Sequence, residues 1–227
     1  MTCKKSIILL SGGLDCACAF SCEKDNIGLA LTFDYGQKAF EQECHAAKKI
    51  AEFYNVEHKV IELPWLKNII KNDVPILQEK DLQNEELMAK TANIVWVPNR
   101  NALFINIAAT FADNIDQIFD KIIIGANGEE AKTFPDNSES FINAVNECLK
   151  YSTKNKVEVS APLIKYDKTD IIRLAVKNKA PLDFIYSCYK GNKKHCNQCE
   201  SCLRLERALK TLDQQTYKKL HAIYFEE

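Results

Sequence analysis

Residues 11–16, with the sequence Ser-Gly-Gly-Leu-Asp-Cys, could bind a phosphate group. They follow the apolar run 7–10 and precede a helical pattern over residues 17–22, so the expected order is strand, tight glycine turn and helix. A turn of this kind directs unpaired backbone N–H groups and the positive end of a helix dipole toward one point. A phosphate binds well at such a point.

The individual residue types fit this interpretation. Gly12 and Gly13 can take positive φ and let an anion approach the backbone, and the Ser11 hydroxyl can donate to a phosphate oxygen. Asp15 suits a phosphate site only beside a cation, which favours Mg²⁺ or a role in holding the loop. The alternative is a glycine turn without a ligand, since Gly-Gly turns are common. Cys16 is interpreted as a small buried side chain rather than a nucleophile.

Four cysteines near the C-terminus have the spacing of a metal site. They are Cys188, Cys196, Cys199 and Cys202. Four thiolates close a tetrahedral Zn²⁺ shell with no open position for water, so a structural zinc is expected. An iron–sulfur cluster is the rival metal group. His195 is adjacent and could compete as a ligand, but four cysteines already suffice.

Two further segments carry cations at the start of an expected helix. Arg100 and Asn101 follow Val-Pro-Asn, and an Arg at a helix start can hold a phosphate bidentately. Lys168 lies in the first turn of its helix, where the dipole disfavours a cation, and a nearby phosphate would explain it. Taken alone, each segment is also compatible with an ordinary solvated helix start.

Composition limits the class of protein. The chain has 227 residues, with 30 basic and 31 acidic side chains, which suits one α/β domain with a small appendage. The near-neutral charge argues against a nucleic-acid partner, and no apolar run is long enough to span a bilayer. No signal peptide is recognisable, so a cytoplasmic protein without a membrane partner is expected.

Hydrophobic patterning predicts alternating strands and helices. The strands are expected at residues 7–10, 27–33, 58–63, 122–125 and 157–164. The helices are expected at residues 17–22, 40–54, 101–115, 138–151 and 167–177. Residues 65–92 have no clear period and are interpreted as a loop with short helices. This order predicts a doubly wound parallel sheet with ligands at the carboxyl ends of its strands. The expected parts are a main domain, 1–185, and a cysteine-bearing helical tail, 186–227.

The loop at residues 11–16 resembles that of the ATP pyrophosphatases, which break ATP between the α and β phosphates and adenylate a substrate. Further segments, in order, make the resemblance specific to one family, 7-cyano-7-deazaguanine synthase of the queuosine pathway. The matching segments are Ser-Gly-Gly-Leu-Asp at 11–15, Thr-Phe-Asp-Tyr-Gly-Gln at 32–37, Val-Pro-Asn-Arg-Asn at 97–101, Phe-Pro-Asp at 134–136, Pro-Leu at 162–163 with Asp167 and Lys168, and Ser-Cys-Tyr at 187–189 with the three later cysteines.

The resemblance implies that the substrates are 7-carboxy-7-deazaguanine, ATP and ammonia. Hydroxide is a poor leaving group, so a carboxylate must first be activated. Transfer of AMP would give a mixed anhydride that ammonia attacks. The resulting amide would be adenylated through its oxygen and would lose AMP to form the nitrile. Positioning of the substrates and stabilisation of the phosphate charge would account for most of the rate enhancement. A homodimer is also expected.

Residue roles are carried over by the same resemblance. Ser11, Gly12, Gly13 and Asp15 would hold the phosphates and Mg²⁺. Arg100 and Lys168 would neutralise the charge on pyrophosphate. The remaining contacts to ATP would come from Leu10, Leu14, Cys16, Thr32, Phe33, Tyr35, Gln37, Asn101 and Gly125. The second substrate would contact Glu130, Lys132, Phe134, Pro135 and Asp136.

The chain departs from the family pattern in two places. Cys16 stands where the family has Ser, and a thiol is the weaker donor. Residues 132–137 read Lys-Thr-Phe-Pro-Asp-Asn where the family has Ser-Gly-Tyr-Pro-Asp-Cys. Three alternatives therefore stay open: an adenylating ligase for a different amine, including one on a macromolecule; a tRNA-modifying thiolase; and a zinc module without enzymatic activity, which leaves the loop at Ser11 unexplained.

Overall fold

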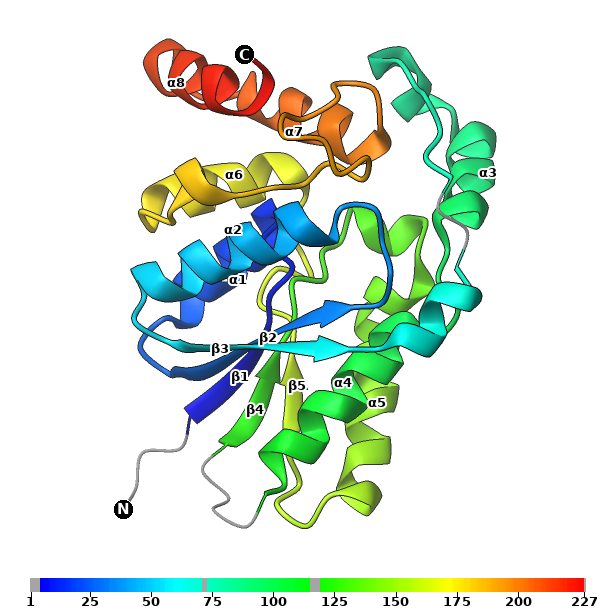
Figure 1. Cartoon of the computed structure of the whole chain (residues 1–227), viewed down its shortest axis with the longest axis vertical. Coiled ribbons are helices and arrows are strands. Elements are labelled where there is room, and N and C mark those ends of the chain that lie inside the picture. Colours follow the sequence, from blue (N-terminus) through cyan, green and yellow to red (C-terminus); the bar gives the residue numbers. More distant parts are fainter. Residues whose placement is uncertain (1–4, 71–72, 115–118, 227) are drawn as a thin grey trace.

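The computed structural model describes residues 5–70, 73–114 and 119–226. Its centre is a five-stranded, all-parallel sheet with the strand order β3-β2-β1-β4-β5 (Figure 1). The strands are β1 (Lys5–Leu9), β2 (Ile27–Asp34), β3 (Glu57–Glu62), β4 (Phe119–Ile123) and β5 (Glu158–Ser160). The expected doubly wound parallel sheet is therefore confirmed.

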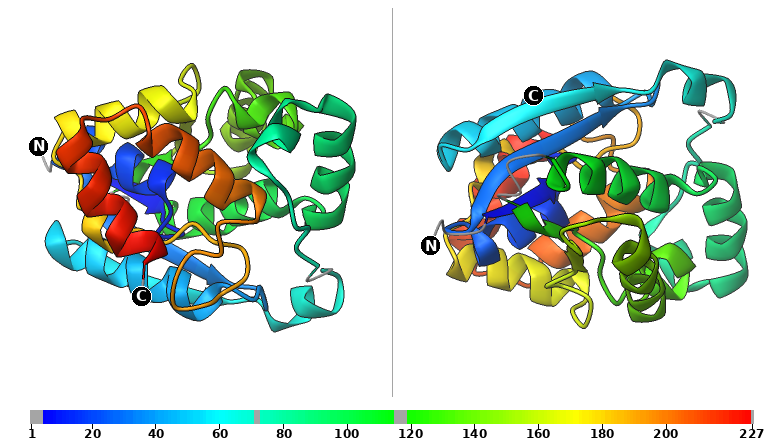
Figure 2. Two further views of the ribbon diagram at one scale, coloured as in Figure 1. Left: turned by 90° about the horizontal axis from the view of Figure 1, so that it is seen from above. Right: turned by 90° about the horizontal axis from the view of Figure 1, so that it is seen from below.

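Helices cover both faces of this sheet. One face carries α1 (Leu14–Glu23), α2 (Phe40–Phe53) and α6 (Lys168–Lys177) (Figure 1). The other carries α4 (Arg100–Ala112) and α5 (Glu139–Ser152). Beyond α6, farther from the sheet, lie α7 (Glu200–Leu209) and α8 (Gln214–Phe225), as the view from above also shows (Figure 2). None of the helices in the described ranges has the length and apolar character that crossing a bilayer requires.

The continuous apolar runs of the central strands follow from this coverage, because a strand buried on both faces needs apolar residues at every position. Ile7 packs in the cluster under α4 and α5, while Ile8 packs in the opposite cluster with α1, α2 and α6. Ile122 and Ile123 divide in the same way. The edge strand β3 is mostly exposed and accordingly more polar.

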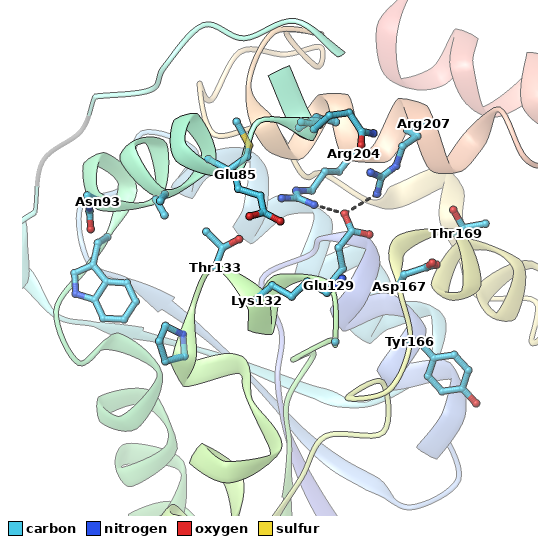
Figure 3. Close-up of a pocket in the computed structure, with 18 of the residues that line it drawn as sticks. Glu85, Asn93, Glu129, Lys132, Thr133, Tyr166, Asp167, Thr169, Arg204 and Arg207 are labelled. Atoms are coloured by element: carbon cyan, nitrogen blue, oxygen red, sulfur yellow. Dashed lines mark hydrogen bonds and ion pairs between the residues drawn. The ribbon is translucent and has the colours of Figure 1, made fainter. Parts of the chain in front are cut away.

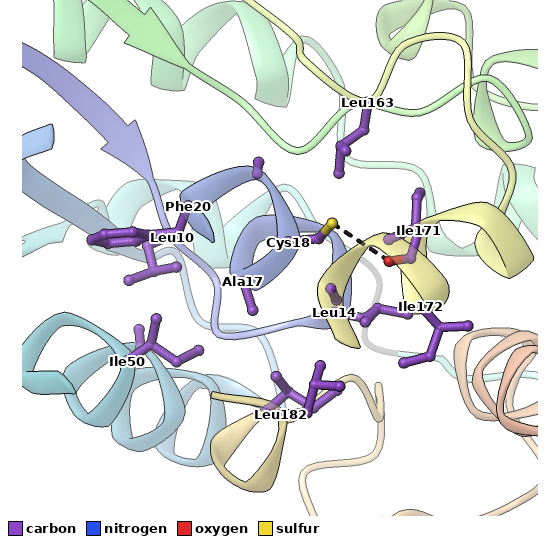
Figure 4. Close-up of a cluster of buried hydrophobic side chains, with 14 of the residues drawn as sticks. Leu10, Leu14, Ala17, Cys18, Phe20, Ile50, Leu163, Ile171, Ile172 and Leu182 are labelled. Atoms are coloured by element: carbon purple, nitrogen blue, oxygen red, sulfur yellow. Dashed lines mark hydrogen bonds between the residues drawn. The ribbon is translucent and has the colours of Figure 1, made fainter. Parts of the chain in front are cut away.

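The C-terminal helices share the core on the α1 side. The cluster drawn in Figure 4 contains Phe20, Ile50 and Ile171, and it extends to Leu205 of α7 and Tyr224 of α8. The buried hydroxyl of Tyr224 donates to the carbonyl of Leu182 at 2.5 Å. The tail after residue 186 therefore packs directly on the main core.

The stretch 65–92, expected as a loop with short helices, contains more regular structure than its pattern indicated. It contains two short 3-10 helices, Pro64–Asn68 and Glu79–Gln83, and most of α3 (Glu85–Val95). The Asn84 side chain caps α3 by accepting from Leu87 N at 3.0 Å. Met88 of α3 packs against Leu203 of α7, a contact far apart in sequence.

Three other boundaries also differ. The extended segment expected at 157–164 forms a strand only over β5, and residues 161–166 turn back toward α6. The helix expected to reach residue 115 ends at Ala112, and residue 115 lies outside the described residues. Two further 3-10 turns, Glu130–Lys132 and Pro135–Asn137, shape the loop after β4.

The sheet places the glycine turn at its topological switch point, because β1 pairs with β2 on one side and β4 on the other. Gly12 has φ +80°, and a Cβ there would lie 2.7 Å from both Ala46 Cβ and the Glu43 carbonyl oxygen. The loop can therefore pass close to α2 only with glycine at this position. The Gly12 carbonyl in turn accepts from Tyr186 N at 2.8 Å.

Gly13 behaves differently from the sequence expectation. It is the N-cap of α1 with φ −76°, an ordinary extended conformation, and not the positive φ expected for both glycines. A Cβ at Gly13 would meet nothing nearer than 3.6 Å. Glycine at this position leaves space for a ligand at the start of α1, and no special backbone conformation requires it.

The two adjacent glycines provide a matched pair for a stability test. Gly12→Ala should lower the free energy of unfolding by about 2–4 kcal/mol, since left-handed strain adds to overpacking against α2. Gly13→Ala, the control, should change it by about 1 kcal/mol or less. Urea denaturation of both variants measures the difference. Equal effects would contradict the close approach of the loop to α2.

Candidate functional site

A cavity of about 250 Å³ opens at the carboxyl ends of β1, β2 and β4. We call it the first cavity. It gathers residues expected from the sequence that are spread over more than 150 positions. Those lining it are Leu10, Ser11, Gly13, Leu14, Asp15, Cys16, Thr32, Phe33, Tyr35, Gln37, Arg100, Asn101, Gly125, Glu130 and Lys168.

The end of β4 reaches the helix start because Gly125 has no side chain. A Cβ at Gly125 would lie 3.0 Å from Cys16 N and 3.2 Å from the Cys16 Sγ. The Cys16 thiol also lies 3.3 Å from the Ser11 hydroxyl, and burial raises the pKa of this thiol. Cys16 is therefore a thiol packed at the cavity wall but only partly buried, whereas the sequence interpretation expected a small buried side chain.

Lys168 is the buried cation of this cavity. Its ammonium binds the Asp15 carboxylate and lies 2.7 Å from the Glu130 carboxylate. The sequence interpretation invoked a phosphate to explain a cation in the first turn of a helix. In the structure two carboxylates supply counter-charge, which the sequence could not reveal because Asp15 lies in α1 and Glu130 in the loop after β4, both far from Lys168 along the chain.

Asp15 keeps one free oxygen. Its Oδ2 accepts from Lys168 and from Asn127 Nδ2 at 3.3 Å, while the buried Oδ1 has no hydrogen-bond partner among the residues that the structure describes. Burial raises the pKa of the Asp15 carboxyl to about 6, against the opposing charge of Lys168. For Glu130, burial also favours the protonated form, but Lys168 outweighs it and the pKa is lowered.

A second cavity, of about 150 Å³, adjoins the first. Phe134 and Asp136 line it, and so does Trp96, whose ring is parallel to that of Phe134 within 5° at a centroid separation of 6.2 Å. The two cavities have a common wall. The residues that line both are Tyr35, Gln37, Glu43, Arg100, Glu130, Asn137 and Tyr189.

Arg100 lies at this common wall. Its guanidinium donates to the Tyr35 hydroxyl at 3.5 Å and to Asn101 Oδ1 at 3.4 Å. The Asn101 amide in turn donates to the Asp136 carbonyl at 3.3 Å, which ties the start of α4 to the loop after β4. The guanidinium can therefore reach an anion in either cavity.

The expected substrate residues separate into two groups. Glu130, Phe134 and Asp136 lie at the second cavity, but Lys132 and Pro135 do not line it. They line a wide outer cleft of about 1470 Å³ between α3, α7 and the loops before α6 (Figure 3). The Lys132 side chain is exposed there.

Several residues that line the cavities were not among the expected site residues, including Ser187, Tyr189, Glu43, Trp96 and Asn137. Ser187 Oγ accepts from Leu14 N at 3.3 Å, so it bonds an N–H at the start of α1. Tyr189 and Glu43 line both cavities. The segment 187–189 was among the matching motifs, which could have pointed to Ser187 and Tyr189. Glu43 has no local signal, because it is one of several acidic residues on α2.

The four C-terminal cysteines converge. All four Sγ atoms lie within 4.8 Å of one another, and the Cys196 and Cys202 sulfurs are 3.8 Å apart. Tetrahedral thiolates about 2.3 Å from a metal are separated by nearly this distance. The His195 Nε2 already accepts a hydrogen bond from Ser187 N at 3.0 Å, so this nitrogen is not available as a metal ligand. The cluster can therefore hold a metal with four sulfur ligands.

Comparison with known proteins identifies the family. The family model described as "Queuosine biosynthesis protein QueC" matches residues 5–213. The chain belongs to the QueC family. Curated relatives of this QueC chain carry the name 7-cyano-7-deazaguanine synthase. The Pelotomaculum thermopropionicum protein is 47% identical over 91% of the chain and 97% of the relative, and the Methanosarcina barkeri protein is 43% identical over 91% and 94%.

A solved structure resembles the QueC chain in fold. The NMN synthetase from Francisella tularensis aligns over 98% of this chain and 84% of its own, with a TM-score of 0.50 and 15% identity. At that identity the likeness concerns the fold alone. The family expected from the sequence motifs is confirmed by the comparisons.

Proposed function

We propose that the chain is a 7-cyano-7-deazaguanine synthase that converts 7-carboxy-7-deazaguanine and ammonia to the nitrile with ATP. The observation that carries the proposal is the common wall of the two cavities. A glycine turn and helix start form one side of it, and a pocket bordered by parallel aromatic rings forms the other. This arrangement would bring a phosphate anhydride and a planar acid together at Arg100 and Glu130.

In the first cavity, ATP would place its phosphates at Ser11, Gly12 and Gly13, where N–H groups at the start of α1 can donate. Lys168 and Arg100 would stabilise the charge that develops on pyrophosphate. The unpartnered Asp15 Oδ1 and the neighbouring Glu130 carboxylate supply hard oxygen ligands of the kind Mg²⁺ prefers. Bound Mg²⁺ would shield the phosphate charge.

In the second cavity, the deazaguanine ring would lie against Trp96 and Phe134, with Asp136 and Asn137 available to its polar edge. Its carboxylate would attack the α-phosphorus of ATP and release pyrophosphate. Ammonia would then displace AMP to form the amide. A second adenylation, on the amide oxygen, and loss of AMP would give the nitrile. Substrates that fill both cavities would exclude water from the adenylated species.

The outer position of Lys132 supports ammonia as the acceptor. A cation facing a bound acceptor or the activated carboxyl would have to line the second cavity, and Lys132 lines the outer cleft instead. Coupling to a macromolecular amine remains the alternative function. The wide cleft beside the second cavity is the specific feature that favours it.

The cysteine cluster would hold Zn²⁺ in a structural role. Four thiolates fill a tetrahedral shell, and the nearest His is engaged elsewhere. The division into a main domain, 1–185, and a tail, 186–227, the assembly into a homodimer and a cytoplasmic location stay predictions.

The zinc proposal predicts about one Zn²⁺ per chain in the purified protein. Cys199→Ala should lower the thermal midpoint by several degrees or prevent folding, since metal-binding energy in such sites is folding energy. Cys148→Ala, at an exposed position on α5, is the control and should leave both values unchanged. Metal analysis by mass spectrometry decides the question. Iron with visible absorbance, or no metal, would contradict the proposal.

The chemistry predicts AMP and pyrophosphate, not ADP and phosphate, as the products of ATP. With the carboxylate, ammonia and Mg-ATP present, two ATP should be consumed for each nitrile formed. Arg100→Ala should lower kcat by about a hundredfold, as for loss of one charge-stabilising group. Chromatography of nucleotides and mass spectrometry of the heterocycle measure both. ADP as product would exclude this class of reaction, and amide without nitrile at saturating ATP and ammonia would favour the alternative acceptor.

The position of Lys132 predicts that it is dispensable. Lys132→Ala should leave kcat/KM for nitrile formation within about threefold of the wild-type value, because an exposed side chain outside both cavities contributes little. Phe134→Ala, two residues away but lining the second cavity, should raise KM for the heterocycle at least about tenfold. A larger loss for Lys132→Ala than for Phe134→Ala would place the acceptor in the outer cleft.

A further inference from the structure

A group of connected charged side chains lines the inner part of the outer cleft. It joins Glu129, in the loop after β4, to Arg204 and Arg207 of α7, as Figure 3 shows. The Glu129 carboxylate binds Arg204 and lies 2.5 Å from Arg207 Nη2. On its other side, Arg204 donates through Nε and Nη2 to Glu200 at 2.9 and 2.7 Å.

The second oxygen of Glu129 has a different partner. Glu129 Oε2 accepts from the backbone N–H of Lys168 at 3.1 Å, in the first turn of α6. One carboxylate therefore connects the first turn of α6 to α7. The same residue, Lys168, carries the ammonium that lies between Asp15 and Glu130 in the first cavity.

The loop that carries Glu129 is itself held against the start of α6. Gly128 N donates to the Tyr166 carbonyl at 3.0 Å, and a Cβ at Gly128 would lie 2.9 Å from the Ile164 carbonyl oxygen. Asn127, which is fully buried, donates to Asp15 and accepts from Glu130 N at 2.9 Å. Residues 127–130 thus lie between the glycine turn, α6 and α7.

The Arg204–Glu129 ion pair is buried and not exposed at the surface. The Arg204 and Glu129 side chains are 8% and 13% exposed. The Lys168 N–H and the two arginines hold the pKa of Glu129 at about 2, against the effect of burial. A charge so buried needs its partner, because loss of one member leaves the other uncompensated. Loss of Arg204 would leave the Glu129 carboxylate paired with Arg207, which is 31% exposed, and would let it shift away from the Lys168 N–H that it now accepts from.

We propose that Arg204 is a positioning residue of the first cavity: through Glu129 it fixes the first turn of α6, and so keeps the Lys168 ammonium between Asp15 and Glu130. The inference rests on the proposed function for the role of Lys168 toward pyrophosphate. The placement of the ammonium itself does not depend on that role. The two parts can therefore be tested separately.

The first test needs no turnover. Wild type, Arg204→Gln, Arg204→Lys and Glu129→Gln are treated briefly with acetic anhydride, and acetylation of Lys168 is followed by peptide mass spectrometry relative to the exposed Lys150 of α5. Arg204→Gln and Glu129→Gln should raise the relative rate at Lys168 at least about tenfold, since the ammonium is released from its buried position. Arg204→Lys should restore part of the protection. Lys210→Gln is the control, because Lys210 directly follows α7 and its ammonium pairs with Glu79 and Glu206 rather than with Glu129.

The second test uses the proposed reaction. Arg204→Gln should lower kcat between about tenfold and a hundredfold, with KM for ATP within about threefold, as expected for displacement of a charge that acts in the transition state. In a Lys168→Gln background the same change should lower kcat less than about twofold, because both substitutions act on one group. Zinc content should not change. Lys210→Gln should keep wild-type kcat.

Unchanged acetylation of Lys168 in a folded Arg204→Gln protein would overturn the proposal. It would also be overturned if Arg204→Gln lowered kcat by the same factor in the Lys168→Gln background as in the wild type. If Arg204→Gln does not fold, Arg204→Lys and Glu129→Gln carry the same tests. Failure of all three to fold would assign the pair to folding alone and reject the proposal. If wild type forms no nitrile while the acetylation pattern holds, the proposed function fails and the positioning of Lys168 stands.

Discussion

The buried ammonium of Lys168 is the interaction on which the rest of the site depends. It lies between the carboxylates of Asp15 and Glu130, and these three residues come from α6, α1 and the loop after β4. A buried charge is tolerated only with such partners, and removing one member of a buried pair costs about 3–5 kcal/mol. The ammonium therefore holds together three segments that the chain order keeps far apart.

The topology of the sheet brings Asp15, Glu130 and Lys168 together. With the order β3-β2-β1-β4-β5, strands β2 and β3 are added on one side of β1 and β4 and β5 on the other. The loops after β1 and β4 therefore diverge at the carboxyl ends of these two strands. Gly12 lets the first loop approach α2, and Gly125 lets the end of β4 approach α1. The opening that remains is the first cavity, and the loop after β4 continues from it to the second. In our proposal, this common wall is where ATP and the carboxylate would meet.

The C-terminal tail completes the site in two ways. Tyr186 N donates to the Gly12 carbonyl, and Ser187 accepts an N–H at the start of α1, so residues just before the first cysteine support the glycine turn. After the cysteine cluster, α7 presents Arg204 to Glu129. A metal bound by the four cysteines would stabilise both contacts, because it would join residue 188 to the first turn of α7.

The sequence by itself determined what depends on neighbours along the chain. The glycine turn between an apolar strand and a helix, the alternation that specifies a parallel sheet, and the Cys-x-x-Cys spacing are local patterns. The turn, the parallel sheet and the convergence of the four cysteines are present in the structure, although Gly13 does not take the positive φ expected of it. The motifs were also sufficient for the family. Only the tertiary structure decided which distant charges pair. Lys168 meets Asp15 and Glu130, Arg204 meets Glu129, and Lys132 turns to the outer cleft although Phe134 does not. The physical reason is that ion pairing follows distance in space, and the approach of two loops is set by the packing of the elements that carry them rather than by their own sequence.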